Sequence, residues 1–283
     1  MRRIVGRKPS VIACLVSTAM LAAGRANASA PPDGYLNFVA CPIVRDTEPT
    51  PCWVAEHEGE LYYLGLQQDT EVEFFPPQQG HKALIEGKLT NKPRICGGIP
   101  LEPVKATTLP EIDRSCSQVL PADGWVAPPA ARGALPRLQF VPEEQLATDL
   151  SKTPASRPAP APPTPPYKVE TFIVPFDFEA QFMLNKATRA VQRARRYAVA
   201  VAATRVEIIG YRGAALLSDG TRLVEAEGIA QRRAARVATA IQDLGVGAAQ
   251  VVVRSIDAPI VPTGINDYAQ RRVDIIVTPG KAD

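Results

Sequence analysis

A proline-rich stretch in the middle of the chain does most to limit what this sequence can fold into. From Ser151 to Pro166, seven of the sixteen residues are proline. Proline fixes φ, so such a run favours extended polyproline II, and sixteen positions of this kind span roughly 50 Å. We expect residues 126–166 to be a linker that acts as a spacer between residues 29–125 and residues 167–283. A ligand for proline-recognition modules is the alternative interpretation.

The N-terminus has the parts of a secretory signal peptide. A basic start is followed by an apolar stretch from Val11 to Ala23 and by the small-x-small sequence Ala26-Asn27-Ala28. This apolar stretch is too short to cross a bilayer, which takes about twenty residues. We predict a signal peptide over residues 1–28 and a mature chain without a transmembrane segment. The expected location is the periplasm or cell envelope, and attachment to the outer membrane stays open.

The basic charge of the chain comes mainly from this segment. The predicted signal peptide holds five of the arginine and lysine residues and no acid, so its removal changes the formal net charge from +3 to −2. A slightly acidic mature chain gives no reason to expect a nucleic-acid partner.

Four cysteines remain after the predicted cleavage, and they are Cys41, Cys52, Cys96 and Cys116. An even number in an exported chain predicts two disulfides. Three pairings are possible. We favour Cys41–Cys52 with Cys96–Cys116, because each closes a short local loop, and each bridge would add about 3 kcal/mol to stability.

A metal site is the rival interpretation of these cysteines. The sequence has no C-x-x-C pair, and the two histidines, His57 and His81, lie at no ligand-like spacing to the cysteines. We therefore expect no metal and no cofactor.

The N-terminal part, residues 29–125, has short strand-like segments about ten residues apart. Glycine, proline and aspartate separate them, and they are Cys52–Ala55, Leu61–Leu64, Val72–Phe75 and Lys82–Leu89. This pattern predicts a small all-β domain, either an OB-like barrel or a sandwich, which at this size depends on its disulfides. Trp53, Tyr62 and Tyr63 are expected in its core, with a ligand groove as the alternative.

The C-terminal part changes to α/β periodicity. Apolar residues three and four apart predict a helix over Ala187–Ala203 and a second one that ends at Leu244 before Gly245. The core stripe of the second helix is predicted to be Ala230, Ala234, Val237, Ile241 and Leu244. Strands are predicted near Val169–Phe178, Thr204–Gly210, Val251–Val253 and Val273–Val277, so the predicted order is β-α-β-α-β-β.

Three fragments of this part resemble the OmpA-like peptidoglycan-associating domain. They are Gly210-Tyr211 at the end of a strand, the run from Ile229 to Val237 in place of L-S-x-x-R-A-x-x-V, and Arg271–Ile275 in place of R-R-V-x-I. The resemblance covers about 110 residues from Tyr167 onwards. It implies an α+β fold and a non-catalytic binding module of the bacterial envelope, with peptidoglycan as the partner.

The resemblance also implies a ligand-binding residue. Arg233 stands where this family holds a carboxylate of the diaminopimelate stem peptide, and a planar guanidinium suits that ligand because it can donate two parallel hydrogen bonds. Arg233 directly precedes Ala234, so we expect it on the flank of the apolar stripe. A solvated surface arginine is the alternative.

The other half of the family's site departs from the pattern. Where the family has Gly-x-Thr-Asp, this chain has Arg212 and Gly213, and Ile229-Ala230 replaces the Leu-Ser pair. We include Arg212, Gly213 and Ile229 in the candidate ligand site on position alone. The following loop is about five residues longer than in the family. Asp219 in this loop is our first candidate for a substitute acid, with a turn or cap role as its alternative, and Glu225 is a weaker second candidate.

Two functions remain open. The first is an envelope protein that associates with peptidoglycan through its C-terminal module and tethers the N-terminal domain to the wall. The alternative is an interaction scaffold of an envelope or secretion assembly that has lost peptidoglycan binding, with other envelope proteins as partners. An enzyme is not supported, because the sequence shows no nucleophile arrangement and the C-terminal module has no histidine.

Overall fold

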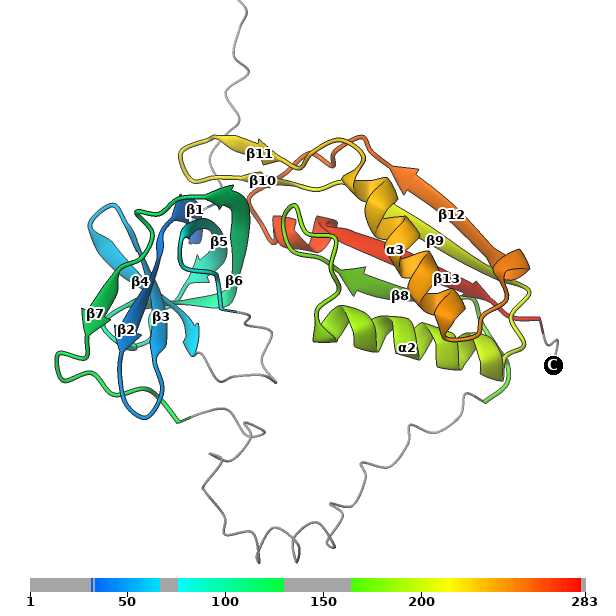
Figure 1. The fold of residues 1–283 in the computed structure, drawn as a ribbon, viewed down its shortest axis with the longest axis horizontal. Coiled ribbons are helices and arrows are strands. Elements are labelled where there is room, and N and C mark those ends of the chain that lie inside the picture. Colours follow the sequence, from blue (N-terminus) through cyan, green and yellow to red (C-terminus); the bar gives the residue numbers. More distant parts are fainter. Residues whose placement is uncertain (1–31, 33, 67–75, 130–163, 281–283) are drawn as a thin grey trace, which may run out of the picture.

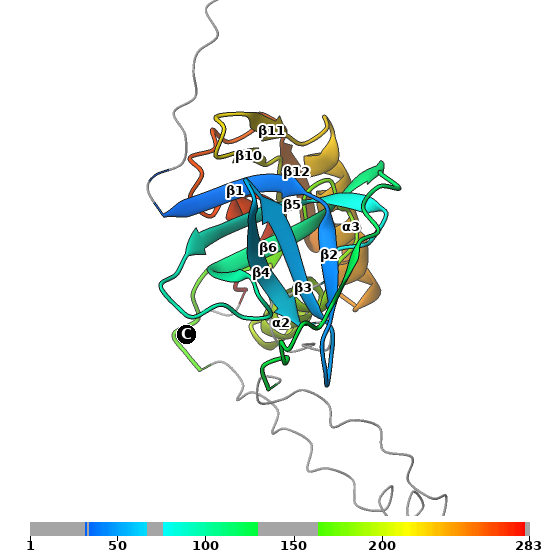
Figure 2. The ribbon, with the colours of Figure 1, turned by 90° about the vertical axis from the view of Figure 1, so that its left-hand side faces the viewer.

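The structure, a computed structural model, describes residues 32, 34–66, 76–129 and 164–280. We call the described residues 34–66 and 76–129 the N-terminal region and residues 164–280 the C-terminal region. The two lie end to end (Figure 1), and in a view along this direction the N-terminal region lies in front of the C-terminal one (Figure 2). The predicted signal peptide, most of the predicted linker and the strand expected at Val72–Phe75 lie outside the described residues.

The N-terminal region is all-β, and its strands follow the order β1-β5-β6-β4-β3-β2-β7. They are β1 (Tyr35–Ala40), β2 (Pro42–Asp46), β3 (Cys52–His57), β4 (Glu60–Leu66), β5 (His81–Leu89), β6 (Ile99–Ile112) and β7 (Val119–Pro121). The strand predictions for β3, β4 and β5 are confirmed. The choice between an OB-like barrel and a sandwich stays a prediction.

Strand β6, the longest strand in the described residues, was not predicted from the sequence. Pro100, Pro103 and Pro110 lie inside it, and proline is rare inside a strand. The strand tolerates Pro100 and Pro103 because its pairing changes there. Its first two residues pair with β4, and the pairing with β5 is irregular around Pro103. Proline is found in sheets at such irregularities, where no ladder hydrogen bond is lost.

The aromatic residues of β3 and β4 fill the core of this region. Trp53 and Tyr62 are 6% and 9% exposed, and they pack with Phe38, Leu64 and Ile85. The expected core role is therefore confirmed for these two residues. Tyr63 packs at the edge of a second cluster, beside the disulfide of Cys52.

The favoured disulfide pairing was wrong. Cys41 bonds Cys116, and Cys52 bonds Cys96, with sequence separations of 75 and 44. The sheet brings these partners together. Strand β2, which follows Cys41, pairs with β7, which follows Cys116, and β4 joins β3 to the start of β6.

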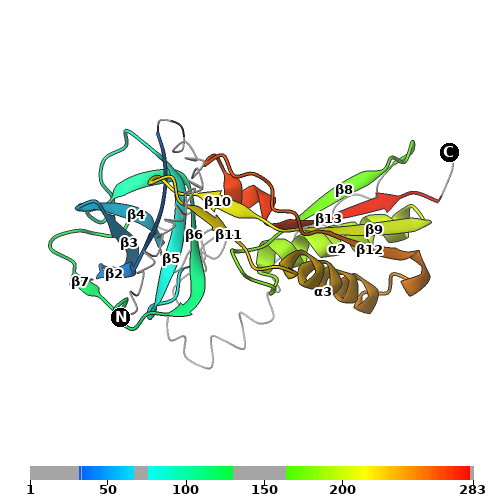
Figure 3. The same ribbon diagram turned by 90° about the horizontal axis from the view of Figure 1, so that it is seen from above.

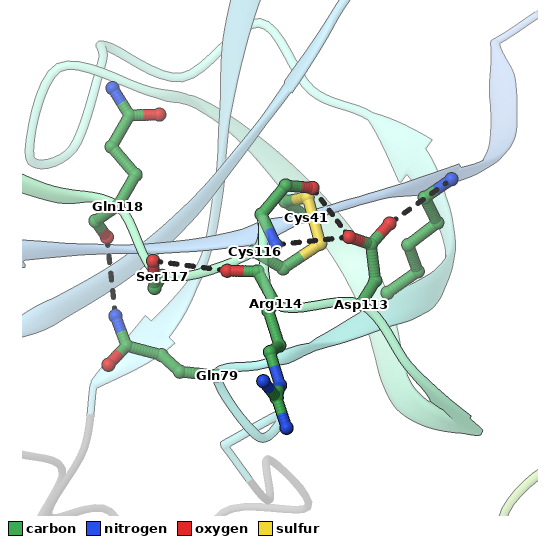
Figure 4. The surroundings of a disulfide bond; sticks show 9 residues. Cys41, Gln79, Asp113, Arg114, Cys116, Ser117 and Gln118 are labelled. Carbon is green, nitrogen blue, oxygen red and sulfur yellow. Dashed lines mark hydrogen bonds and ion pairs between the residues drawn. A yellow bond between two sulfur atoms is a disulfide. The ribbon is translucent and has the colours of Figure 1, made fainter.

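Figure 4 shows the first disulfide against the segment that runs from Asp113 to Gln118. The side-chain amide of Gln79 donates to the Gln118 carbonyl oxygen at 3.2 Å. The bridge therefore ties together parts of the chain that are distant in the sequence, which local loop length could not reveal.

The C-terminal region has the predicted β-α-β-α-β-β order with one addition. Its elements are β8 (Glu170–Pro175), α2 (Asn185–Ala200), β9 (Arg205–Tyr211), β10 (Ala214–Leu216), β11 (Arg222–Val224), α3 (Ile229–Asp243), the 3₁₀ turn η1 (Ala248–Gln250), β12 (Val251–Ile256), the 3₁₀ turn η2 (Asp267–Gln270) and β13 (Arg272–Thr278). The sheet order is β12-β9-β13-β8, with β12 parallel to β9. The loop that is longer than in the resembled family folds as the β10–β11 hairpin.

Helices α2 and α3 cover one face of this sheet (Figure 3). The predicted core positions Ala230, Ala234, Val237 and Ile241 are buried, whereas Leu244 is 39% exposed because α3 ends before it. Helix and sheet approach closely at Gly210, where an added Cβ would lie 2.1 Å from the Ala230 carbonyl oxygen. Only glycine fits this contact, which sets the start of α3 directly against β9.

Candidate functional site

Arg233 is completely buried, so the alternative interpretation of a solvated surface arginine was wrong. Its side chain is 0% exposed. The loop after β8, residues 176–180, accepts hydrogen bonds from it over the first turns of α3. The helical position beside Ala234 was predicted correctly, but a loop distant in sequence covers it.

Every N–H of the Arg233 guanidinium has an acceptor. Nε donates to the Ala180 carbonyl at 2.8 Å, and Nη2 donates to the Asp177 carbonyl at 2.8 Å. Nη1 also reaches the Tyr211 carbonyl at 3.4 Å. The two remaining donors bind both carboxylate oxygens of Glu225, at 2.8 and 2.5 Å. An arginine has five N–H donors, so none is left for a ligand.

Glu225 is satisfied in the same way. It is 0% exposed and, besides Arg233, accepts the backbone N–H groups of Glu179 at 2.9 Å and Gly213 at 2.8 Å. A carboxylate offers about four acceptor positions, and four donors occupy them here. The ring of Phe176 lies 5.2 Å from the Arg233 Cζ atom and adds a cation–π contact. The pair is closed on all sides by its own protein.

Gly213 and Arg212 belong to this hydrogen-bond network. Neither residue points an unbound polar group into a cavity. An added Cβ at Gly213 would lie 2.5 Å from Cγ of Arg271 and 3.3 Å from Glu225 Oε2. A family-type aspartate therefore has no room there. Arg212 donates through Nε to the Glu225 carbonyl at 2.5 Å and through Nη1 to the Asp257 carbonyl at 3.3 Å, which fixes the chain before α3.

Asp219 does not face Arg233. It is exposed in the β10–β11 turn and accepts the Thr221 backbone N–H at 2.8 Å. That hydrogen bond lowers the pKa of the Asp219 carboxyl. The preference for Asp219 over Glu225 as the acid opposite Arg233 was wrong, because Asp219 makes the turn. Ile229 is buried at the start of α3 and contributes packing.

A second buried ion pair lies beside the first, and no pattern in the sequence indicated it. Arg271, at the entry to β13, binds both carboxylate oxygens of Glu86, which comes from β5 of the N-terminal region. The two residues are 0% and 1% exposed. Burial raises the pKa of the Glu86 carboxyl, and the charge of Arg271 opposes this shift. Arg271, the first residue of the fragment that resembles the family's R-R-V-x-I, here joins the two regions.

Further buried contacts cross the same interface. The side-chain amide of Asn37 in β1, 2% exposed, donates to the carbonyl oxygens of Leu216 and Gly264, each at 2.9 Å. The ammonium of Lys105 in β6 lies 2.5 Å from the Asp177 carboxylate. An apolar cluster of Leu84, Phe178, Ala215 and Leu217 fills the space between these polar contacts.

A metal site and a membrane-spanning helix are two further features to consider in the described residues. Within residues 34–66, 76–129 and 164–280, no group of three histidine, cysteine, aspartate or glutamate side chains is placed to hold a metal ion. No helix in the described part of the chain combines the length and the apolar character needed to cross a membrane.

Comparison with known proteins returns OmpA-like domains among the solved structures. The OmpA-like domain of FopA1 from Francisella tularensis subsp. tularensis SCHU S4 is 13% identical, covers 40% of this chain and 75% of its own, and gives a TM-score of 0.31. The periplasmic domain of Helicobacter pylori MotB is 15% identical, with coverages of 41% and 88% and a TM-score of 0.30. The peptidoglycan-associated lipoprotein of Burkholderia pseudomallei is 24% identical, with coverages of 38% and 90% and a TM-score of 0.31.

The solved structures that match are thus of the kind that the resemblance predicted, and each of these covers about 40% of this chain. Identities and TM-scores of this size carry no conclusion about a ligand. No model of a known protein family matches the sequence, and no curated protein matches it either.

Proposed function

We propose that this chain is a non-catalytic protein of the bacterial cell envelope whose OmpA-like C-terminal region serves as an interaction scaffold. The carboxylate position of this region is filled by the protein's own Glu225. The observation that carries the proposal is the closed pair itself. Arg233 and Glu225 are both 0% exposed, and each finds all its hydrogen-bond partners inside the protein.

The energetic cost of opening the pair supports this choice. Separating a buried ion pair so that one charge stays unpaired costs about 3–5 kcal/mol. At 1.4 kcal/mol for each factor of ten, a ligand that displaced Glu225 would lose roughly two to four orders of magnitude in affinity unless it replaced these contacts. A stem peptide would bring its own carboxylate, but Glu225 would then have to leave Gly213 and Glu179 as well.

The test is co-sedimentation of the full chain with diaminopimelate-type peptidoglycan sacculi. We expect wild type to stay in the supernatant, together with Arg233→Ala and the matched control Arg232→Ala, whose arginine is exposed on the same helix. Pelleting of wild type that Arg233→Ala abolishes and Arg232→Ala preserves would overturn the scaffold proposal. Near-UV circular dichroism checks that Arg233→Ala keeps its tertiary structure.

Association with peptidoglycan through Arg233 is the second candidate. One observation favours it, because the guanidinium already holds a carboxylate with two hydrogen bonds, at 2.8 and 2.5 Å, as recognition of a stem peptide requires. Under this candidate Arg233→Lys, which keeps the charge and loses the planar fork, would weaken pelleting strongly. Tethering of the N-terminal region to the wall would follow from it.

A further inference from the structure

The loop that closes the Arg233–Glu225 pair is bound from both sides. Its inner side faces the pair, through the carbonyls of Asp177 and Ala180 and the N–H of Glu179. Its outer side faces the N-terminal region. The Asp177 carboxylate meets Lys105, and the Phe178 ring packs with Leu84. The Asp177 and Phe178 side chains therefore hold the N-terminal region, while the loop backbone and the Glu179 carboxylate, which accepts the Ala226 N–H, hold the chain around the buried pair.

The second connection runs through Arg271. Its guanidinium is held by Glu86, and its Cζ lies 5.7 Å from the Phe178 ring. Its Cγ stands where a side chain at Gly213 would otherwise be, and the Gly213 N–H donates to Glu225 Oε2. Contacts thus lead without a gap from Glu86 through Arg271 and Gly213 to Glu225. Both connections begin on adjacent strands of the N-terminal region, β5 and β6.

The loop also has room on its outer side. A cleft of about 680 Å³ lies between the regions, lined by Asp177 to Ala180 from the loop and by residues of β6 such as Thr108 and Leu109. Outward movement of the loop into this cleft requires that the Asp177–Lys105 ion pair and the Phe178–Leu84 contact part. The Phe182 side chain, 57% exposed, also lines the cleft.

We propose that the N-terminal region is an intramolecular lock: by holding the loop of residues 177–180 and Arg271, it keeps Glu225 in the carboxylate position of Arg233. Release of the N-terminal region lets the loop move outward and exposes Arg233 to a carboxylate ligand. The inference rests on the proposed function, because it names what keeps the site of the scaffold closed. It adds a regulated state in which a partner that draws the N-terminal region away opens the site.

The lock is tested on the full chain with variants on the N-terminal side alone. Lys105→Ala removes the contact to the loop, and Glu86→Ala removes the contact to Arg271. Lys82→Ala is the matched control, because Lys82 on β5 is exposed and its ion pair, 3.5 Å to Asp113, stays within the N-terminal region. None of these residues touches Arg233 or Glu225.

The first measurement is amide hydrogen exchange at Glu179 and Gly213, whose N–H groups donate to Glu225. We expect exchange about tenfold faster at Glu179 in Lys105→Ala and at Gly213 in Glu86→Ala, since each loses the contact that holds its side of the pair. Lys82→Ala should match wild type. Unchanged exchange at both amides in both variants would overturn the lock.

The second measurement is co-sedimentation of the same proteins with diaminopimelate-type sacculi. Pelleting by Lys105→Ala or Glu86→Ala, lost when Arg233→Ala is added, supports the lock. Faster exchange without pelleting overturns the claim that the lock controls a ligand position, and the scaffold proposal survives it. Arg233-dependent pelleting of wild type instead overturns the proposed function, so the two failures are distinguishable.

Discussion

The two buried arginine–glutamate pairs of this protein differ in what surrounds them. Arg233 and Glu225 lie eight residues apart in one region, and backbone groups complete the hydrogen bonding of both. Arg271 and Glu86 are 185 residues apart and join two regions. Within the described part of the chain, Nε of Arg271 is buried without a hydrogen-bond partner. The first pair is built into a domain, whereas the second depends on the docking of one region on another.

Buried arginine–glutamate pairs therefore have two roles in this protein, one within a region and one between regions. A buried pair adds little net stability, since desolvation offsets its attraction, but removal of one partner is costly because a buried charge is left alone. Arg233 reaches water only if the loop of residues 177–180, whose backbone carbonyls accept its hydrogen bonds, moves away. For Arg271 the route to water is separation of the two regions, which would hydrate it.

The largest expected effect comes from Glu225→Ala. It leaves Arg233 charged and buried and removes acceptors from Gly213 and Glu179. We expect a loss of about 3–5 kcal/mol in the free energy of unfolding, measured by urea denaturation. The exposed neighbour Glu227 provides the control, and Glu227→Ala should change stability by less than about 0.5 kcal/mol. Equal effects of the two substitutions would contradict the closed network.

Glu86→Ala should cost less, about 1–3 kcal/mol, because the regions can separate and let water reach Arg271. Small-angle scattering should show a larger radius of gyration than for wild type, while the cores of both regions stay folded. A compact protein with an unchanged radius would mean that the remaining contacts, such as those of Asn37, hold the interface by themselves.

The Glu86–Arg271 pair makes the stability of the protein depend on pH. Burial raises the pKa of the Glu86 carboxyl above its ordinary value of 4.5. The groups around it are Arg271 and Lys105, which lower its pKa, and Asp267, which raises it. Since the folded protein binds this proton more tightly than the unfolded chain, the contribution to stability is fully present below pH 4.5 and is lost as the pH rises through the folded-state pKa.

Glu86→Gln cannot ionise and tests this sign. Urea denaturation of both proteins across a pH series should show the stability of wild type falling, relative to Glu86→Gln, as the pH rises from 4.5. A difference that is constant with pH, or that changes in the opposite direction, would show that Arg271 outweighs the cost of burial at this site.

The smallest effect is expected for Asp219→Ala. This carboxylate is exposed and supports only the β10–β11 turn through Thr221. Stability should stay within about 0.5 kcal/mol of wild type, and exchange at the Gly213 amide should not change. If exchange at the Gly213 amide became much faster in this variant, Asp219 would have to be included in the Arg233 site.

Local sequence was enough for much of the C-terminal region. The alternation of Val206 and Ile208, the stripe on α3 and the helix end before Gly245 predicted strands and helices in the correct order. These patterns work because side-chain periodicity reports which face of one element is buried. In the N-terminal region the same approach found β3, β4 and β5, but it missed β6, whose prolines lie where pairing changes.

Local sequence patterns could not predict the partners of charged and sulfur-containing side chains. Loop length favoured Cys41–Cys52, but sheet neighbours give Cys41–Cys116. Arg233 was placed at the correct helical position, and Asp219 was preferred as its acid over Glu225. Such choices depend on which distant segments come together, and no local pattern carries that information.

The sequence by itself determined the elements of the C-terminal region, their order and the position of Arg233 on its helix, because short-range periodicity and backbone preferences fix these. Only the tertiary structure decided that Arg233 is closed off by Glu225 and that Glu86 reaches Arg271. The physical reason is that a buried charge must find its partners across space, from whichever loops and strands the packing brings against it.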